Sequence, residues 1–474
     1  MTIRTPLALA ACAALVLTAD SCSTRPLQPP RTQPTAGPWL QYGSADAAGF
    51  DAGRLDLARR YADSVRSGAV MIVHRGLVVQ AWGDVARKLE LHSVRKSIVS
   101  AVYGIAGDRR QIDIDRTLGT LGVTDRVPLT DGERGARVRD LLAARSGVYL
   151  PAAYADASQD SARPPRGSHP SNTFFWYNNW DFNVLGVIYE RFVDSSLYAS
   201  ITERLARPLG MEDWAPIDGF LAYEPSGSMH PAHTMRMSAR DLARFGQLYL
   251  QGGTWNGRQV ISRQWVSEST SPKSDFGDGQ GYGYLWWTAA PGYFGGRYPE
   301  LSRRALFYGS GTGGQLVAVI PSDDLVIIHR GDTDHGRNIA GRDAWRIVEM
   351  ILAARRDAAD VATHPVPMST IAFATQLPPV APPTYITIDS ALAAELVGRY
   401  QVAPNTVVRV FLFAGRLFAN FPGQGEAELF ALSRSEFTIR VQSGVRILFE
   451  RNERGEVSGF SGQIGPQRVR GVKN

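Results

Sequence analysis

Cysteine is nearly absent from this chain. Of its 474 residues only Cys12 and Cys22 are cysteines, and both lie within the first 22 positions. The rest of the chain therefore contains neither a disulfide nor a cysteine-based metal site. Long runs of Lys or Arg are also missing, and the net charge of +6 is spread along the sequence. This distribution argues against a nucleic-acid-binding tail and indicates only a mild attraction to anionic surfaces.

Hydrophobic runs long enough to span a bilayer are missing as well. The apolar stretch at residues 6–19 has instead the length of a signal-peptide core. One interpretation places cleavage after Ala19. The other notes that Ala-Asp-Ser-Cys resembles a bacterial lipobox, with Cys22 as the lipidated first residue. Both interpretations make residues 1–22 a signal peptide and predict an exported protein, either periplasmic or attached to the outer membrane as a lipoprotein.

What the chain does have is the apolar patterning of a large folded body at residues 50–360. Two apolar runs separated by the turn residues His-Arg-Gly predict a β-hairpin at 68–82, and further strands are predicted at 282–287, 316–321 and 324–330. The sequence between the first and last strands is mostly helical in pattern. This arrangement predicts an α/β protein of the α+β type, in which one antiparallel sheet is assembled from distant segments, flanked by helices and joined to a helical subdomain.

Proline-rich segments border this body on both sides. Residues 23–49 and 361–388 have little apolar periodicity, so we interpret both as linkers. Residues 389–474 then show short β runs separated by turn-forming residues. This pattern is typical of a small barrel or sandwich, so the chain is predicted to end in a separate all-β domain.

The first candidate for chemistry is the stretch Ser-Val-Arg-Lys from Ser93 to Lys96. It begins a run in which apolar residues recur at helical spacing. If Ser93 lies at the helix N-terminus, Lys96 follows one turn later on the same face and brings an amine close to a hydroxyl. Free backbone N–H groups and the helix dipole would stabilise an oxyanion there. The alternative is an N-cap serine followed by a solvated lysine, because matches this short occur by chance.

Two further segments carry candidate residues. Tyr177 and Asn179 lie two positions apart in FFWYNNWDF, where a phenol able to shuttle a proton and an amide can share one side of a loop. A buried aromatic beside a turn is the alternative. Residues 309–315, GSGTGGQ, match G-x-G-x-x-G, but no helix follows them, so dinucleotide binding is not predicted. They form either a tight turn or a strand entry whose backbone a ligand can approach closely.

Together these motifs resemble those of a known enzyme family. The order S-x-x-K, Y-x-N and glycine-rich strand entry is similar to the serine hydrolases of the penicillin-binding protein and class C β-lactamase type. Flanking segments such as VRDLLAARSGV, MSARDLARFGQLYLQGG and YGYLWW look like stretches of β-lactamase-related esterases and amide hydrolases. The segment GTGGQLVAVIP most resembles the amide-cleaving nylon-oligomer hydrolases. The resemblance covers residues 50–355, and the C-terminal part is similar to small β-domains appended to some of these enzymes.

The resemblance implies a role for each matched residue. Ser93 would be the acylated nucleophile, and Lys96 would accept its proton or hold Tyr177 as a phenolate that does so. Tyr177 would then protonate the leaving group and help to activate the deacylating water. Asn179 would orient the Lys96 amine and the carbonyl side of the substrate.

The resemblance also implies an oxyanion hole between the nucleophile and the glycine-rich strand entry. The residues implied in this hole and in substrate binding are Ser93, Gly311, Thr312, Gly313 and Gln315. The two N–H donors would belong to Ser93 and Thr312, whereas a shift of register would give the second role to Gln315.

One departure from the family bears on the substrate. The third motif usually begins with Lys or His, and in β-lactam-binding members that cation meets the substrate carboxylate. Here Gly309 stands in its place. Its presence favours an uncharged ester or amide over penicillin. Arg330 on the following strand is either a replacement for the missing cation or a surface or structural charge.

The sequence is therefore interpreted as an exported serine hydrolase that cleaves an ester or amide bond of a small molecule. Two alternatives stay open: a D-amino-acid peptidase or carboxypeptidase acting on cell-wall fragments, and a non-catalytic penicillin-binding-like sensor. No cofactor and no nucleic-acid partner are expected. His230 and His233 are separated by Pro-Ala and lack an adjoining carboxylate cluster, so no metal site is expected either. The sequence leaves the oligomeric state open.

Overall fold

The computed structural model describes residues 38–474 except 156, 357–363, 382, 423–424, 441–443 and 465–466. The predicted signal peptide at 1–22, including Cys22, and the start of the first linker lie outside the described residues. Within the described part of the chain, no helix is both long and apolar enough to cross a bilayer.

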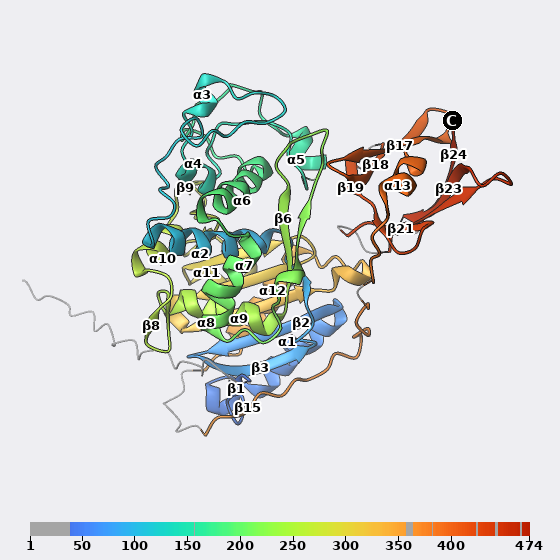
Figure 1. Ribbon diagram of the computed structural model, residues 1–474. Helices are drawn as coiled ribbons and strands as arrows, with labels where there is room; N and C mark the ends of the chain where they lie inside the picture. Colours follow the sequence, from blue (N-terminus) through green and yellow to red (C-terminus); the bar gives the residue numbers. More distant parts are fainter. Residues whose placement is uncertain are drawn as a thin grey trace, which may run out of the picture.

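A ten-stranded sheet forms the centre of the body (Figure 1), in the order β15-β1-β3-β2-β14-β13-β12-β11-β10-β9. Its strands are β1 (Leu40–Gln41), β2 (Ser67–His74), β3 (Leu77–Gly83), β9 (Ser274–Asp275), β10 (Gln280–Tyr282), β11 (Trp287–Ala289), β12 (Leu306–Gly311), β13 (Gln315–Ile320), β14 (Leu325–Gly331) and β15 (Val366–Pro367). All pairs are antiparallel except β1 with β3. Because β2 pairs with β14, with Ile72 opposite Ile327, the sheet is assembled from distant segments, as predicted.

The central strands are apolar on both faces because helices cover both faces. Along β2, Val70 and Ile72 pack into one core, while Met71 and Val73 pack into the other. Successive side chains of a strand point to opposite faces, so an unbroken apolar run is the pattern of a strand covered on both sides. The first core is completed by α1 (Ala52–Ser64) and α12 (Gly341–Ala353), and the second by helices that include α2 (Arg95–Asp108), α6 (Asn179–Val193) and α9 (Ala239–Leu250).

The predicted helical subdomain lies between β3 and β9. Besides α2, α6 and α9 it contains α3 (Asp131–Arg134), α4 (Val138–Leu142), α5 (Ala157–Ser161), α7 (Leu197–Ile201), α8 (Arg207–Leu209) and α10 (Arg263–Ser269). A small sheet in the order β4-β6-β5 accompanies them, formed by β4 (Leu89–Glu90), β5 (Gly219–Ala222) and β6 (Ala232–Met237). The hairpin of β7 (Thr254–Trp255) and β8 (Arg258–Gln259) and the short helix α11 (Pro299–Ser302) complete the body.

The C-terminal part is a separate, nearly closed all-β domain, as predicted. Its nine-stranded sheet has the order β19-β18-β17-β16-β24-β23-β22-β21-β20. The elements are α13 (Ser390–Leu396), β16 (Gly398–Ala403), β17 (Thr406–Phe413), β18 (Arg416–Phe421), β19 (Gly425–Glu428), β20 (Phe430–Ala431), β21 (Glu436–Thr438), β22 (Arg446–Arg451), β23 (Val457–Ile464) and β24 (Gln467–Lys473). Tyr400, Phe449 and Phe460 pack ring against ring in its core.

Two parts of the body differ from the sequence-based expectation. Residues 282–287 do not form one strand: Tyr282 ends β10, Trp287 begins β11, and the residues between them form a turn in which Leu285 has a left-handed φ of 63°. Parts of the two segments interpreted as linkers join the body, since β1 pairs with β15. The buried side chains of Trp39 and Phe373 anchor these two segments, although both are rich in proline.

Candidate active site

Ser93 lies in a turn that connects the small sheet to helix α2. β4 pairs with β6, and the Leu91 N–H extends this contact by donating to the Met235 carbonyl at 2.9 Å. His92 then takes a left-handed φ of 46°, which is uncommon for a residue other than glycine. Ser93 follows in the 3-10 turn η2 (His92–Val94), so Val94 and not Ser93 holds the N-cap position of α2.

An amine, a phenol and a hydroxyl converge at Ser93. Lys96 Nζ lies 2.8 Å from Ser93 Oγ and 4.8 Å from the centre of the Tyr177 ring. The Tyr177 phenol is hydrogen-bonded to Ser93. Burial raises the pKa of Tyr177 to about 12, while the Ser93 hydrogen bond and the charge of Arg95 act in the opposite direction. The phenol is therefore neutral at neutral pH.

Tyr177 is held by the start of helix α6 and by an aromatic neighbour. Asn178 caps α6, because its Oδ1 accepts from the Trp180 N–H at 3.2 Å and its Nδ2 donates to the Val148 carbonyl at 2.7 Å. The Tyr177 ring stacks on Trp287, with 5.6 Å between centroids and 21° between planes. The cap fixes the backbone and the stacking fixes the ring, so the phenol keeps its place beside Ser93.

Asn179 is anchored to the segment around Tyr154 by its amide nitrogen. Nδ2 donates to the Tyr154 carbonyl at 2.9 Å and to Gln159 Oε1 at 3.0 Å. Oδ1 is buried and accepts no hydrogen bond from the described residues. The amide hydrogens of Asn179 are therefore engaged away from Lys96, and only Oδ1 is available for the orienting role that the resemblance implies.

The glycine-rich strand entry lies directly against the nucleophile. A Cβ added to Gly311 would be 3.0 Å from the Ser93 nitrogen and 2.7 Å from the Leu91 carbonyl, so only glycine permits this approach of β12. Thr312 follows and is exposed. Gly313 forms the turn to β13 with a left-handed φ of 78°, and its missing Cβ leaves room for Thr333. The structure thus places Gly311, and with it the Thr312 backbone, beside Ser93.

Gln315 and Arg330 are structural neighbours of each other. Gln315 Nε2 donates to the Gly331 carbonyl at 2.9 Å, and its Oε1 accepts from Arg330 Nε at 2.7 Å. The Arg330 guanidinium also donates to the backbone carbonyls of Met237, Leu89 and Glu90. Arg330 is fully buried and surrounded by these acceptors, so it is a structural charge and does not replace the cation missing at Gly309.

The position of Gly309 explains why a cation is missing there. A Cβ at this position would lie 2.9 Å from Ser97 Oγ and 3.0 Å from Val317 Cγ1. Any larger side chain has to push aside the Ser97 hydroxyl of α2 and the Val317 side chain of β13. The close packing of β12 under α2 therefore favours glycine where the family usually has Lys or His.

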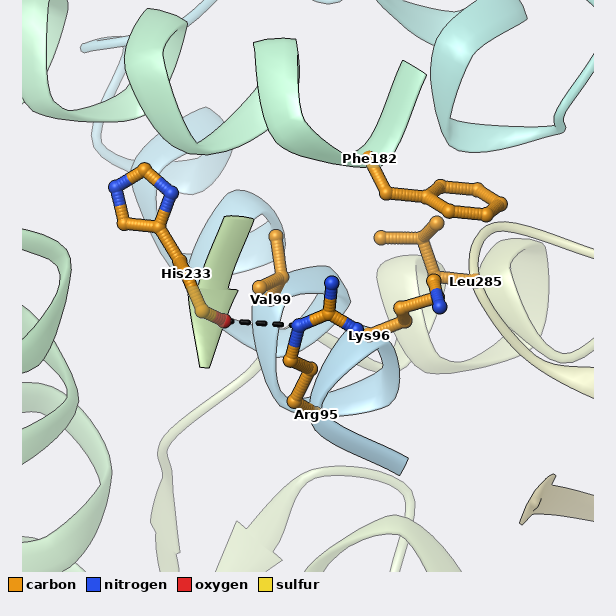
Figure 2. A pocket seen from close by; sticks show the side chains of 6 residues that line it. All are labelled: Arg95, Lys96, Val99, Phe182, His233 and Leu285. Atoms are coloured by element: carbon orange, nitrogen blue, oxygen red, sulfur yellow. Dashed lines mark hydrogen bonds between the residues drawn. The ribbon is translucent and has the colours of Figure 1, made fainter. Parts of the chain in front are cut away.

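A small pocket opens beside Lys96 (Figure 2). Its volume of about 10 Å³ is roughly the room that one water molecule needs. Its lining residues are Arg95, Lys96, Val99, Phe182, His233 and Leu285. Arg95 Nε donates to the His233 carbonyl at 2.9 Å, as Figure 2 shows, which holds the guanidinium next to Lys96.

The histidines considered as metal ligands have other partners. His230 Nε2 lies 2.8 Å from the Thr124 carbonyl, and His233 Nε2 lies 3.4 Å from Glu190 Oε1. Among the residues that the structure describes, no group of three or more His, Cys, Asp or Glu side chains could hold a metal ion.

Sequence reasoning missed residues that surround Ser93. Tyr154 binds both Asn179 and His92, and Arg95 lies 5.4 Å from the centre of the Tyr154 ring. Arg95 lies within the S-x-x-K motif, so the sequence could have indicated it. Tyr154 stands in an ordinary loop sequence, LPAAYAD, and no local signal marks it.

This geometry agrees with the comparison to known families. A family model described as Beta-lactamase matches residues 55–348, and the chain therefore belongs to the β-lactamase family. It is a serine hydrolase of the β-lactamase-related type. A comparison with curated protein sequences finds no match.

Solved structures share the fold at low sequence identity. A Bacillus anthracis protein assigned as a 6-aminohexanoate-dimer hydrolase is 18% identical with a TM-score of 0.50, covering 69% of this chain and 89% of its own. SurE is 16% identical with a TM-score of 0.47, covering 90% and 99%. An octameric penicillin-binding protein homologue from Pyrococcus abyssi is 16% identical with a TM-score of 0.46, covering 89% and 100%.

Proposed function

We propose that this protein cleaves esters or amides of small, uncharged substrates through an acyl-enzyme at Ser93. The observation that carries this proposal is the convergence of Lys96 Nζ and the Tyr177 phenol on Ser93 Oγ. A serine hydroxyl is a weak nucleophile, and it needs an adjacent base to attack a carbonyl.

In the proposed mechanism Lys96 is the base that accepts the Ser93 proton. The reaction requires a neutral amine at the moment of attack, and Lys96 is 3% exposed and lies beside Arg95. Tyr177 is protonated, so it acts as the acid that delivers a proton to the leaving group. The Ser93 and Thr312 N–H groups would stabilise the oxyanion. Water then releases the acyl group, with the same residues acting in reverse.

The substrate class follows from the charges around the site. Gly309 supplies no cation, and the Arg330 guanidinium is occupied by backbone carbonyls and Gln315. A substrate carboxylate would find neither of these two cations, so it would lack the compensation for its desolvation that they would give. We therefore expect uncharged esters and amides to be turned over faster than penicillins.

A fluorophosphonate probe tests the nucleophile. We expect the probe to add its mass to the peptide that contains Ser93, and Ser93→Ala to abolish both this labelling and the hydrolysis of p-nitrophenyl esters. Ser97→Ala, one turn further along α2, is the matched control and should keep the labelling. An intact, folded protein that takes up no probe and hydrolyses neither esters, linear amides nor D-amino-acid amides would instead favour the non-catalytic sensor.

We further propose that the protein is exported and held at the outer membrane by a lipid on Cys22. The apolar stretch at 6–19 and the lipobox-like sequence that ends at Cys22 support this proposal. The proline-rich segment that follows would act as a tether between the lipid and the folded body.

A further inference from the structure

The C-terminal sheet lies next to the part of the body that carries α5 and β6 (Figure 1). The Phe418 ring of β18 meets Tyr223 edge-on, with 6.5 Å between centroids, and the Arg416 guanidinium lies 4.9 Å from the Tyr223 ring. Arg440 lies 4.7 Å from the ring of Phe220 in β5. These contacts place the C-terminal sheet on residues 220–226 of the body, which are the end of β5 and the start of the loop that follows it.

Glu426 on β19 joins the two parts of the molecule. Glu426 is buried, with a side chain that is 1% exposed, and its Oε2 accepts from the Ser226 N–H in the body at 2.7 Å. Oε1 faces its own domain, where Asn420 Nδ2 donates at 3.3 Å and Arg409 lies at 3.8 Å. Hydrogen bonds to an ionised acceptor are stronger than neutral ones, so this contact fixes the position of Ser226.

Glu224 links the Ser226 turn to the active site. The turn is tight, because the Glu224 carbonyl accepts from the N–H groups of Gly227 and Ser228 at 3.0 and 3.2 Å. Holding Ser226 therefore also holds Glu224. The Glu224 side chain reaches the opposite segment, where its Oε1 accepts from the Tyr154 N–H at 2.9 Å.

Tyr154 is a strained residue whose polar groups are all engaged. Its φ of 63° is left-handed, which costs energy for a residue with a large side chain. Its N–H binds Glu224, its carbonyl accepts from Asn179, and its hydroxyl lies 2.9 Å from His92 Nδ1. His92 precedes Ser93 in the chain, so Tyr154 connects the nucleophile turn to the start of α6. Such a conformation persists only where the surroundings enforce it.

We propose that the C-terminal sheet positions Tyr154, which forms one wall of the active site beside the nucleophile turn. Glu426 and Glu224 are the positioning residues that hold Tyr154 in place. The chain of contacts runs from Glu426 through Ser226 and Glu224 to Tyr154, and each link is a hydrogen bond or a tight turn. The effect of this positioning on substrate binding rests on the proposed function. The coupling between the C-terminal sheet and Tyr154 does not depend on it. Larger acyl groups should depend on this wall more than small ones.

Hydrogen–deuterium exchange in the full chain tests the coupling without relying on activity. Glu426→Ala should speed exchange of the Tyr154 amide by about tenfold or more, because one charge-assisted hydrogen bond is lost. Glu426→Gln keeps an acceptor oxygen and should restore slow exchange. Glu436→Ala, which removes a carboxylate paired with Arg446 in the same domain, is the matched control. Unchanged exchange at Tyr154 in Glu426→Ala would overturn the proposal.

Kinetics test the positioning role. Glu426→Ala should raise KM for p-nitrophenyl decanoate about threefold or more, with a smaller effect on the acetate ester and unchanged fluorophosphonate labelling of Ser93. Equal kinetics in Glu426→Ala and the wild type would overturn this role. If Glu426→Ala does not fold, Glu426→Asp keeps the charge but shortens the side chain, so it should weaken the bond to Ser226 and still raise exchange at Tyr154, by a smaller factor. A wild type without labelling would refute the proposed function, while the exchange result would still decide the coupling.

Discussion

At the scale of single residues, the protonation states of Lys96 and Tyr177 decide which of them acts as the base and which as the acid. Tyr177 is a neutral acid at neutral pH, since burial raises its pKa to about 12. Lys96→Ala removes the base and should lower kcat for all substrates by about 10²–10⁴.

Tyr177→Phe should lower kcat for an anilide more than for a p-nitrophenyl ester, because p-nitrophenolate leaves without being protonated. Steady-state kinetics on both substrates measures this ratio. Equal losses would show that Tyr177 is not the leaving-group acid.

Gly309 is a residue whose side chain is excluded by packing. Gly309→Ala places a Cβ 2.9 Å from Ser97 Oγ and 3.0 Å from Val317, and overpacking of this kind costs about 1–3 kcal/mol. We expect a lower unfolding midpoint in urea for Gly309→Ala. The control is Gly132→Ala, because a Cβ at Gly132 in α3 would meet nothing within 4 Å. Equal midpoints for the two variants would contradict the packing argument.

At the scale of elements, the pairing of β4 with β6 buries a carboxyl group. Glu90 lies opposite Arg236, is 8% exposed, and its Oε1 accepts no hydrogen bond from the described residues. Burial raises the pKa of Glu90 from 4.5 to about 7, although Arg236 and Arg95 act against the rise. The folded protein thus retains a proton that the unfolded chain has lost, and the free energy of unfolding falls as pH rises from 4.5 to about 7.

Glu90→Gln should remove this dependence on pH. The difference between 4.5 and about 7 corresponds to about 3 kcal/mol, so relative to wild type the variant should gain up to that amount between pH 4 and pH 8. Urea unfolding at a series of pH values measures it. Glu436→Gln, with an exposed ion pair to Arg446, should show no such trend. A constant difference between Glu90→Gln and wild type would mean that Glu90 ionises normally in the fold.

The elements that sequence predicted well are those with a local cause. The hairpin of β2 and β3 has an apolar run on each side of Arg75 and Gly76, and both turn residues take the positive φ that a tight hairpin requires. The run YGYLWW predicts one strand, but it contains the end of β10, a turn and the start of β11. The Trp286 ring stacks on Phe245 in the core, and the Trp287 ring stacks on Tyr177. Periodicity could not distinguish two strand ends from one strand.

At the scale of the whole molecule, the sequence predicted the class of fold and the central motifs but not how distant parts meet. Ser93 and Lys96 are neighbours in the chain, so their contact follows from helical spacing. The bond between Ser226 and Glu426 joins residues 200 positions apart. Tyr154 and Glu224 are likewise connected only by the fold. No local pattern encodes such contacts, because they depend on how complete domains pack.

The proposed attachment to the outer membrane concerns the whole molecule and depends on Cys22. If Cys22 carries a lipid, the wild type should be found in the membrane fraction and should incorporate labelled palmitate, because an acyl chain partitions strongly into a bilayer. Cys22→Ser should lose the label and move to the soluble fraction. Cys12→Ser alters the other cysteine of the same leader, upstream of both cleavage points, and should leave the membrane fraction unchanged. If the wild type is soluble and its mature chain begins after Ala19, the lipobox-like sequence is not used.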